Sequence, residues 1–215
     1  MVSAADDQAI SSRFGDSIWI TDFITPRNPD VQLLHERLTE GLKSPEERII
    51  SLWRYVAEIP YRESIATKLV IDGKSYKQSD TWLYPTETIR LAPYANCVNK
   101  SFLLVSLLRN ELPETRVFCC MGHVSIDGIG AHAWVEYETR LGRLLLEPTQ
   151  PNLEKALIPT KLATAYDPVL CFNDKKVYNT PDQGSLPAIL NERFGFCAIP
   201  FLGDYLCKRC ADLEH

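Results

Sequence analysis

Residues 96–113 read NCVNKSFLLVSLLRNELP, in which an asparagine and a cysteine precede a mostly apolar run that closes at a proline. Asparagine is a preferred N-cap residue and proline cannot continue a helix, so the stretch predicts a helix whose first residue is Cys97. Apolar side chains occupy nearly every side of this helix, including the face shared by Cys97, Ser101, Leu104 and Leu108. The sequence therefore places a thiol at the first turn of a buried helix.

A thiol in this position can be interpreted in two ways. Most cysteines in apolar helices are small buried core residues. The N–H groups of the first turn and the positive end of the helix dipole nevertheless favour a thiolate over a thiol, and the thiolate is the nucleophilic form. A catalytic role for Cys97 thus requires a base and an orienting acid elsewhere in the chain.

A base and an acid follow in a predicted pair of strands. The segment 115–126, TRVFCCMGHVSI, is a β-branched and apolar run typical of a buried strand, with its two adjacent cysteines on opposite faces. Further on, AHAWVEYET alternates between two faces, and Gly142 can turn the chain back into LLLEPT. Residues 132–147 therefore resemble a β-hairpin that begins at His132 and ends at Glu147.

The register of this hairpin decides whether its histidine and its acid meet. If the numbers of paired residues sum to 279, His132 and Glu147 stand directly opposite each other; a sum of 281 makes them diagonal neighbours on one face. An even sum would separate them onto opposite faces. The hairpin thus permits a carboxylate to orient the imidazole, without fixing that it does.

The rest of the chain predicts a mixture of helices and loops. Apolar residues at helical spacing predict a helix over 30–42, and Ser44 followed by a proline and two acids predicts a second helix that runs to about Glu58. The polar, proline-broken segment 61–95 predicts a long loop with one hairpin around residues 72–73, and long ordered loops often carry function.

Composition narrows the possible classes of protein. The 215 residues are enough for about one domain, and 45% hydrophobic with 24% charged residues is typical of globular chains. The net charge of −5 and the lack of a basic cluster argue against nucleic-acid binding, and no apolar run approaches a membrane span. The N-terminus lacks the pattern of a secretion signal, and seven cysteines are an odd count, so we expect a cytoplasmic protein with mostly free thiols.

A cysteine at a helix start, a histidine and an acid in that order resemble the transglutaminase-like superfamily of papain-like thiol enzymes. The resemblance is carried by NCVNKSFLLVSLLR, GAHAWVEYE and LLLEPT. It implies an α+β, papain-like transglutaminase-core fold, with the nucleophile at the N-terminus of a central helix packed on an antiparallel sheet. We expect a single domain over 1–212, with a core of about 44–150, an N-terminal helical extension 1–43 and a C-terminal hairpin and tail 151–212. Residues 213–215 resemble a vector-derived tail.

The resemblance also assigns roles to residues. It makes Cys97 the nucleophile, His132 the base and Glu147 the orienting acid, although the family usually has aspartate in the third place and a glycine with a small or acidic residue before the cysteine. An upstream aromatic residue helps to hold the oxyanion in this family, and Tyr61 in IPYRES matches it better than Trp82.

The implied chemistry is attack on an amide bond through a thioester intermediate, without a metal or an organic cofactor. A cysteine protease or amidase acting on a peptide or a small amide is the favoured function. The alternatives are a protein-glutamine acyltransferase that cross-links proteins, or a catalytically silent interaction module that presents the 61–95 loop to a partner.

Two other groups of residues, one of cysteines and one of histidines, are candidates for a functional role. Cys207 and Cys210 have the CxxC spacing of half a zinc site, which Cys171 and Cys197 could complete, or of a redox disulfide, but free thiols are the favoured interpretation. The sequence predicts structural roles for His35 and His123, with His123 in place of His132 as the less favoured alternative.

Overall fold

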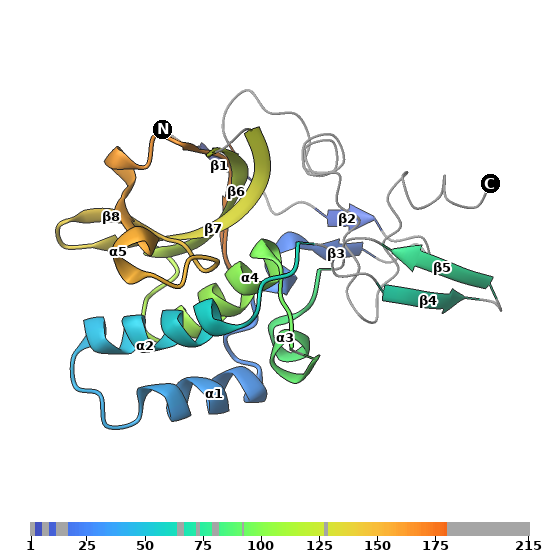
Figure 1. Cartoon of the computed structure of the whole chain (residues 1–215), viewed down its shortest axis with the longest axis horizontal. Helices are drawn as coiled ribbons and strands as arrows, with labels where there is room; N and C mark the ends of the chain where they lie inside the picture. Colours follow the sequence, from blue (N-terminus) through green and yellow to red (C-terminus); the bar gives the residue numbers. More distant parts are fainter. Residues whose placement is uncertain are drawn as a thin grey trace.

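A computed structural model describes residues 3–5, 9–11, 17–63, 67–71, 74–78, 82–91, 93–126 and 129–179. Its centre is an antiparallel sheet of seven strands: β1 (Ser3–Ala5), β6 (Val117–Ser125), β7 (Ile129–Thr139), β8 (Gly142–Leu146), β9 (Leu157–Pro159), β10 (Tyr166–Phe172) and β11 (Val177–Asn179). The strands lie in the order β1-β11-β10-β6-β7-β8-β9, so that β6 and β7 occupy the middle. The curved sheet and the helices below it form two layers (Figure 1).

The helical layer is built around α4. The α-helices are α1 (Pro29–Thr39), α2 (Pro45–Glu58), α3 (Pro85–Leu91), α4 (Cys97–Leu108) and α5 (Leu153–Ala156), with 3₁₀ turns at η1 (Ile20–Phe23) and η2 (Thr160–Leu162). Helix α4 contacts β6 and β7 on one side and α1, α2 and α3 on the other. Two further strand pairs, β2 (Ala9–Ser11) with β3 (Ser17–Trp19) and β4 (Thr67–Ile71) with β5 (Lys74–Gln78), complete the described elements.

Helix α4 begins and packs as its sequence predicts. The side chain of Asn96 accepts a hydrogen bond from the N–H of Asn99 at 2.9 Å, which caps the helix so that Cys97 is its first residue. All twelve of its residues are buried, and Leu104 has no exposed surface. A helix enclosed on every side in this way holds its first turn in a fixed place.

The other predicted helices form, with one changed boundary. Helix α2 begins at Pro45 behind a capping box in which Ser44 and Glu47 bond to each other's backbone N–H, and it ends at Glu58 as predicted. Helix α1 ends at Thr39, three residues earlier than the predicted end at residue 42. Gly41 has a φ of 74°, a left-handed conformation that a helix cannot contain.

The segment 61–95 is more ordered than a long loop. The predicted hairpin is present as β4 paired with β5, while its turn at residues 72–73 lies outside the described residues. Helix α3 was not predicted, and Trp82 is completely buried, with its ring 5.4 Å from that of Phe23 and 5.6 Å from that of Phe102. The loop prediction is wrong there because aromatic packing, which polar neighbours in the sequence conceal, fixes the chain.

The predicted strands form with the predicted faces, although β7 begins at Ile129, three residues before the predicted start at His132, and β8 ends at Leu146, so that Glu147 directly follows it. Cys119 packs in the core between the sheet and α4, and Cys120 packs in a second cluster on the opposite face. There the thiol of Cys120 lies 2.9 Å from that of Cys171 on β10. Cys171 therefore belongs to this buried pair, whereas Cys197, Cys207 and Cys210, together with the tail 213–215, lie outside the described residues.

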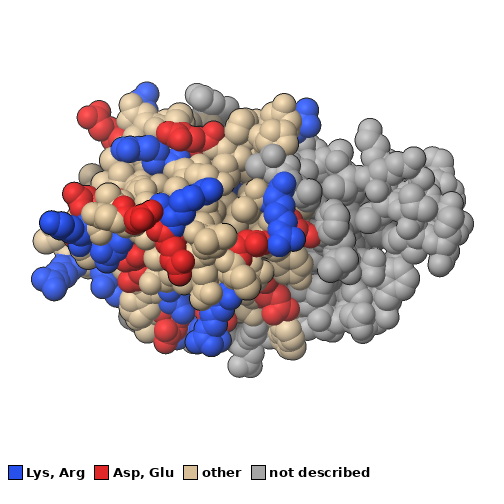
Figure 2. Space-filling model, turned by 90° about the horizontal axis from the view of Figure 1, so that it is seen from below, with Lys and Arg blue, Asp and Glu red and all other residues tan. Residues whose placement is uncertain are grey.

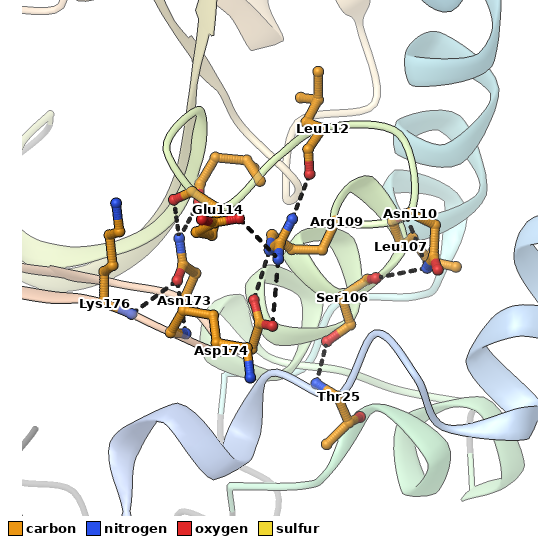
Figure 3. Close-up of polar contacts among 12 residues, drawn as sticks. Thr25, Ser106, Leu107, Arg109, Asn110, Leu112, Glu114, Asn173, Asp174 and Lys176 are labelled. Carbon is orange, nitrogen blue, oxygen red and sulfur yellow. Dashed lines mark hydrogen bonds and ion pairs between the residues drawn. The ribbon is translucent and has the colours of Figure 1, made fainter.

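The C-terminal end of α4 is tied to the turn between β10 and β11 (Figure 3). Arg109 Nε donates to Asp174 Oδ1 at 2.6 Å. The buried side chain of Asn173 donates to the carbonyls of Glu114 and Val117 and accepts the N–H groups of the two lysines that follow in the turn. This cluster fixes the distal end of the helix against the sheet.

The surface and the helix lengths add two observations. On the face seen in Figure 2, basic and acidic side chains are interspersed over the described residues. Within the described part of the chain, no helix is long and apolar enough to cross a membrane. The cytoplasmic location and the single-domain organisation remain predictions.

Candidate active site

The structure brings the predicted base and acid together. Paired residues of β7 and β8 sum to 281, as in Val135 opposite Leu146, so His132 and Glu147 are diagonal neighbours on one face. His132 Nε2 lies 2.8 Å from Glu147 Oε2. The predicted geometry is thus confirmed in the second of the two permitted registers.

Every polar atom of Glu147 has a hydrogen-bond partner. Its Oε1 accepts the N–H of Thr149 at 2.9 Å and the Thr149 hydroxyl at 2.6 Å, while Oε2 accepts the hydroxyl of Tyr166 at 3.2 Å in addition to its contact with His132. Its backbone is held as well, because its carbonyl accepts the indole N–H of Trp53 and its N–H donates to the carbonyl of Ala156. A carboxylate so enclosed has one position.

The charge of Glu147 follows from these contacts. Burial alone would raise the pKa of Glu147, but hydrogen bonds and charge from His132, with the hydrogen bonds of Thr149, outweigh burial and lower the pKa below its ordinary value. The group is therefore a carboxylate at neutral pH, the form that stabilises a positive imidazole.

His132 connects this carboxylate with the thiol. Burial alone would lower the pKa of His132, but hydrogen bonds to Cys97 and Glu147 and the charges of both raise the pKa to about 10. Since Nε2 is engaged by Glu147, Nδ1 is the ring atom left for Cys97. The ring also stacks on Trp134, with centroids 6.3 Å apart and planes 18° apart, which restricts its rotation.

A bulge in β10 lets Tyr166 reach the site. The register of β10 against β6 shifts between Pro168 and Leu170, which presses the strand onto Gly122, the residue directly opposite His132. A Cβ at Gly122 would lie only 2.0 Å from the carbonyl oxygen of Asp167, so no larger residue fits. Tyr166, just before this bulge, points its hydroxyl at the carboxylate.

Tyr61 lies beside the chain that leads into α4. It forms a parallel bridge with Ala95, flanked by hydrogen bonds from the N–H of Ala95 to Pro60 and from the N–H of Arg62 to Ala95. Burial raises the pKa of Tyr61 well above its ordinary value, and the charge of Cys97 and a hydrogen bond with it act in the same direction. The structure thus brings Tyr61 to the thiol, whereas Trp82 is buried in the aromatic core.

The remaining histidines are placed elsewhere. His35 Nε2 lies 2.8 Å from Glu111 Oε1, in a cluster with Arg48 between α1, α2 and the end of α4. His123 pairs with Ala131, so its side chain lies on the face of the sheet opposite to His132 and Glu147. The structure does not bring either residue to the carboxylate.

A cleft of about 450 Å³ opens beside the histidine and the acid. Its walls include Gln150, Tyr166, Ile126 and Ile129, and these two isoleucines are 57% and 82% exposed. The cleft gives a substrate access to the face that carries His132. Among the described residues, no group of three or more His, Cys, Asp or Glu side chains could hold a metal ion. The expectation of chemistry without a metal remains a prediction.

Sequence analysis missed several residues of the site. Thr149 could have been found, since a hydroxyl two residues after an acid often bonds to it. Lys100 could have been noticed as a lone charge in an apolar helix. Trp53 and Tyr166 left no signal, because only tertiary packing brings α2 and β10 to the carboxylate.

No protein-family model matches the sequence, and no curated protein matches it. Among solved structures, the chain is similar to LapG of Legionella pneumophila in an EGTA-treated form, with a TM-score of 0.52 and 16% identity over 73% of this chain and 77% of that chain. A second structure of LapG from this organism has a TM-score of 0.49 and 18% identity over 70% of this chain and 76% of the other.

Because the identity is low, the likeness to the EGTA-treated structure shows the fold alone. The fold of this chain is the transglutaminase-like one that LapG also has, with a cysteine-bearing helix packed on an antiparallel sheet. The predicted α+β fold class is confirmed.

Proposed function

We propose that this protein is a thiol-dependent hydrolase of amide bonds, with a peptide or a small amide as its substrate. Cys97 is the nucleophile, His132 the general base and acid, and Glu147 the group that orients the imidazole and stabilises its charged form. The observation that carries the proposal is the 2.8 Å contact between His132 Nε2 and Glu147 Oε2. The same imidazole also forms a hydrogen bond with Cys97 at the start of α4.

The reaction follows from these positions. The thiolate of Cys97 attacks the amide carbonyl, and the carbonyl oxygen becomes an oxyanion. His132 then delivers a proton to the nitrogen of the leaving amine, which departs and leaves a thioester. Water, deprotonated by His132, attacks the thioester and releases the acid and the free thiol. No step needs a metal or an organic cofactor.

Two donors are candidates for stabilising the oxyanion. The first N–H groups of a helix have no partner within the helix, which makes the N–H of Cys97 one candidate. The hydroxyl of Tyr61 is the other, since it lies near the thiol and the high pKa of Tyr61 keeps it protonated. Each donor contributes only while the negative charge develops, which is the condition for faster chemistry.

Other functions receive less support. A silent interaction module would need no buried carboxylate that contacts a histidine and is fixed by three further donors. The ordered helix α3 and the buried Trp82 also shorten the stretch of the 61–95 segment that could be presented to a partner. A cross-linking acyltransferase would use the same three groups, with an amine in place of water.

Labelling with a thiol-reactive peptide probe and with iodoacetamide at about pH 6 tests the proposal, because ordinary thiols are largely protonated there. We expect Cys97 to be the first cysteine modified in the folded protein. Cys119 and Cys120 are internal controls, since burial raises the pKa of both thiols and they are enclosed in the sheet. Preferential labelling of Cys207 or Cys210 would count heavily against the triad.

A further inference from the structure

Lys100 is a buried lysine one helical turn after Cys97. Its side chain belongs to the apolar interior of α4, and the residue is 1% exposed. Lysine is almost never fully buried unless its ammonium is paired, because removing the charge from water is costly. The proposed reaction does not use Lys100, so the reaction does not explain why this side chain is buried.

The ammonium of Lys100 joins two other segments to α4. Its Nζ donates to the carbonyl of Ala57 at 3.0 Å and to the carbonyl of Pro148 at 3.3 Å. Ala57 lies at the end of α2, four residues before Tyr61, and Pro148 directly follows Glu147. One side chain therefore connects the three segments that carry the nucleophile, the oxyanion tyrosine and the orienting acid.

The charges of the buried groups also link Lys100 to Glu147. In the proposed mechanism the nucleophilic thiolate and the imidazolium cancel each other, which leaves the buried carboxylate of Glu147 without a neutralising partner. Burial lowers the pKa of Lys100 to about 8, and the charge of Glu147 opposes that change, so the amine is still mostly protonated at neutral pH. The ammonium supplies the missing positive charge from behind the acid.

We propose that Lys100 is a positioning residue: it holds the backbone at Glu147 and Pro148 against the first turn of α4, and so keeps His132 aimed at Cys97. The inference rests on the proposed function, in which these three groups form the triad. It predicts that the reactivity of Cys97 depends on a side chain that touches neither the thiol's substrate nor the imidazole.

The test compares Lys100→Met with Arg109→Met. Methionine has a similar length and no donor, so it removes the two hydrogen bonds and the charge while filling the space. Arg109 is the matched control, because it is a largely enclosed cation of the same helix that pairs with Asp174 at the opposite end. The measurement is the rate of iodoacetamide alkylation of Cys97 from pH 5 to pH 9, with circular dichroism to confirm folding.

In Lys100→Met we expect alkylation of Cys97 near pH 6 to be slower by about tenfold or more, approaching an ordinary thiol. Arg109→Met should keep the wild-type profile even where its melting temperature falls. A folded Lys100→Met variant with the wild-type profile would overturn the proposal, and so would an equal loss in Arg109→Met, since a general loosening of α4 would then explain both.

A second variant covers the case in which methionine prevents folding. Lys100→Gln supplies an amide donor that can reach one of the two carbonyls, and this variant should fold. Its alkylation rate at Cys97 against pH should lie between that of the wild type and that of an ordinary thiol. A wild-type profile in this variant would also overturn the proposal. Alkylation needs no substrate, so a wild type whose Cys97 reacts fast but which cleaves no amide would refute the proposed hydrolysis and leave the role of Lys100 standing. A slow Cys97 in the wild type would refute both.

Discussion

The two ends of α4 use buried polar side chains for different purposes. At the C-terminal end, Arg109 pairs with Asp174 and Asn173 satisfies the turn around it (Figure 3), with no nucleophile among them. At the N-terminal end, Cys97 and Lys100 stand among groups with shifted pKa values, and two of these neighbours, His132 and Glu147, line a cleft. Burial of charge alone therefore does not mark a functional site. The chemistry of the partners, and the cleft that His132 and Glu147 line, distinguish the two ends.

Substituting the nucleophile or the base, at the N-terminal end of α4, should cause the largest loss of activity. We expect Cys97→Ala and His132→Ala each to lower the rate of amide hydrolysis by about 10⁴-fold or more, and their effects should not add, because each removes a step that the other cannot replace. Turnover of a peptide library measures this, with circular dichroism as the check on folding. Equal cleavage by the wild type and Cys97→Ala would exclude the thiol mechanism.

Glu147→Gln should be the next largest effect. Both carboxylate oxygens accept from two donors, so an amide must turn its NH₂ group either toward Thr149 or toward His132. In the second case the ring takes its proton on Nδ1, the atom that must accept one from the thiol. We expect a loss of about 10²–10⁴-fold in kcat.

The control for Glu147→Gln is Glu111→Gln. Glu111 also bonds a histidine, His35, at 2.8 Å, but it does so near the distal end of α4. Its substitution should leave kcat unchanged. If Glu147→Gln retained nearly full activity, the carboxylate would have no role in aiming the imidazole.

Arg109→Met should affect stability without affecting the site. It leaves Asp174, which is only 12% exposed, without its guanidinium partner at 2.6 Å. We expect the free energy of unfolding to fall by about 2–3 kcal/mol, less than for a fully buried pair because both groups keep some contact with water. Urea denaturation measures the loss, and unchanged kcat per folded molecule completes the comparison. A fall in kcat would mean that the two ends are coupled.

The smallest effect concerns the pH dependence of stability. The pKa of His132 is raised from 6.5 to about 10, so its contribution is full below pH 6.5 and is lost as the pH rises toward 10. The pKa of Lys100 is lowered from 10.5 to about 8, so the folded state releases that proton first and stability is regained between pH 8 and 10.5.

We therefore expect the free energy of unfolding to fall between pH 6.5 and 8, by at most about 1.4 kcal/mol per pH unit, and to level off above pH 8. Urea denaturation across this range measures the profile. His132→Gln should remove the fall, whereas Arg109→Met should keep it at a lower overall stability. A profile that rises between pH 6.5 and 8 would contradict the assigned protonation of His132.

Local chemistry made several features predictable. The Asn96 cap, the proline that follows the helix and the apolar run fix where α4 begins, because capping and burial act within a few residues. Alternation along β7 and the glycine turn fix the hairpin that carries His132 and Glu147. From these alone the order of nucleophile, base and acid, and their possible meeting, could be stated.

Tertiary structure decided the rest. The choice between the two permitted registers depends on how β7 and β8 pack, and no local pattern encodes it. The aromatic cluster around Trp82 depends on Phe23 in η1, which lies far away in the sequence, and α3 is held by packing against α1 and α4. The same holds for the partners of Glu147: Trp53 and Tyr166 reach it from 94 and 19 residues away. A sequence pattern records which side chains can do chemistry, whereas the folded chain alone determines which of them are close enough to act on one another.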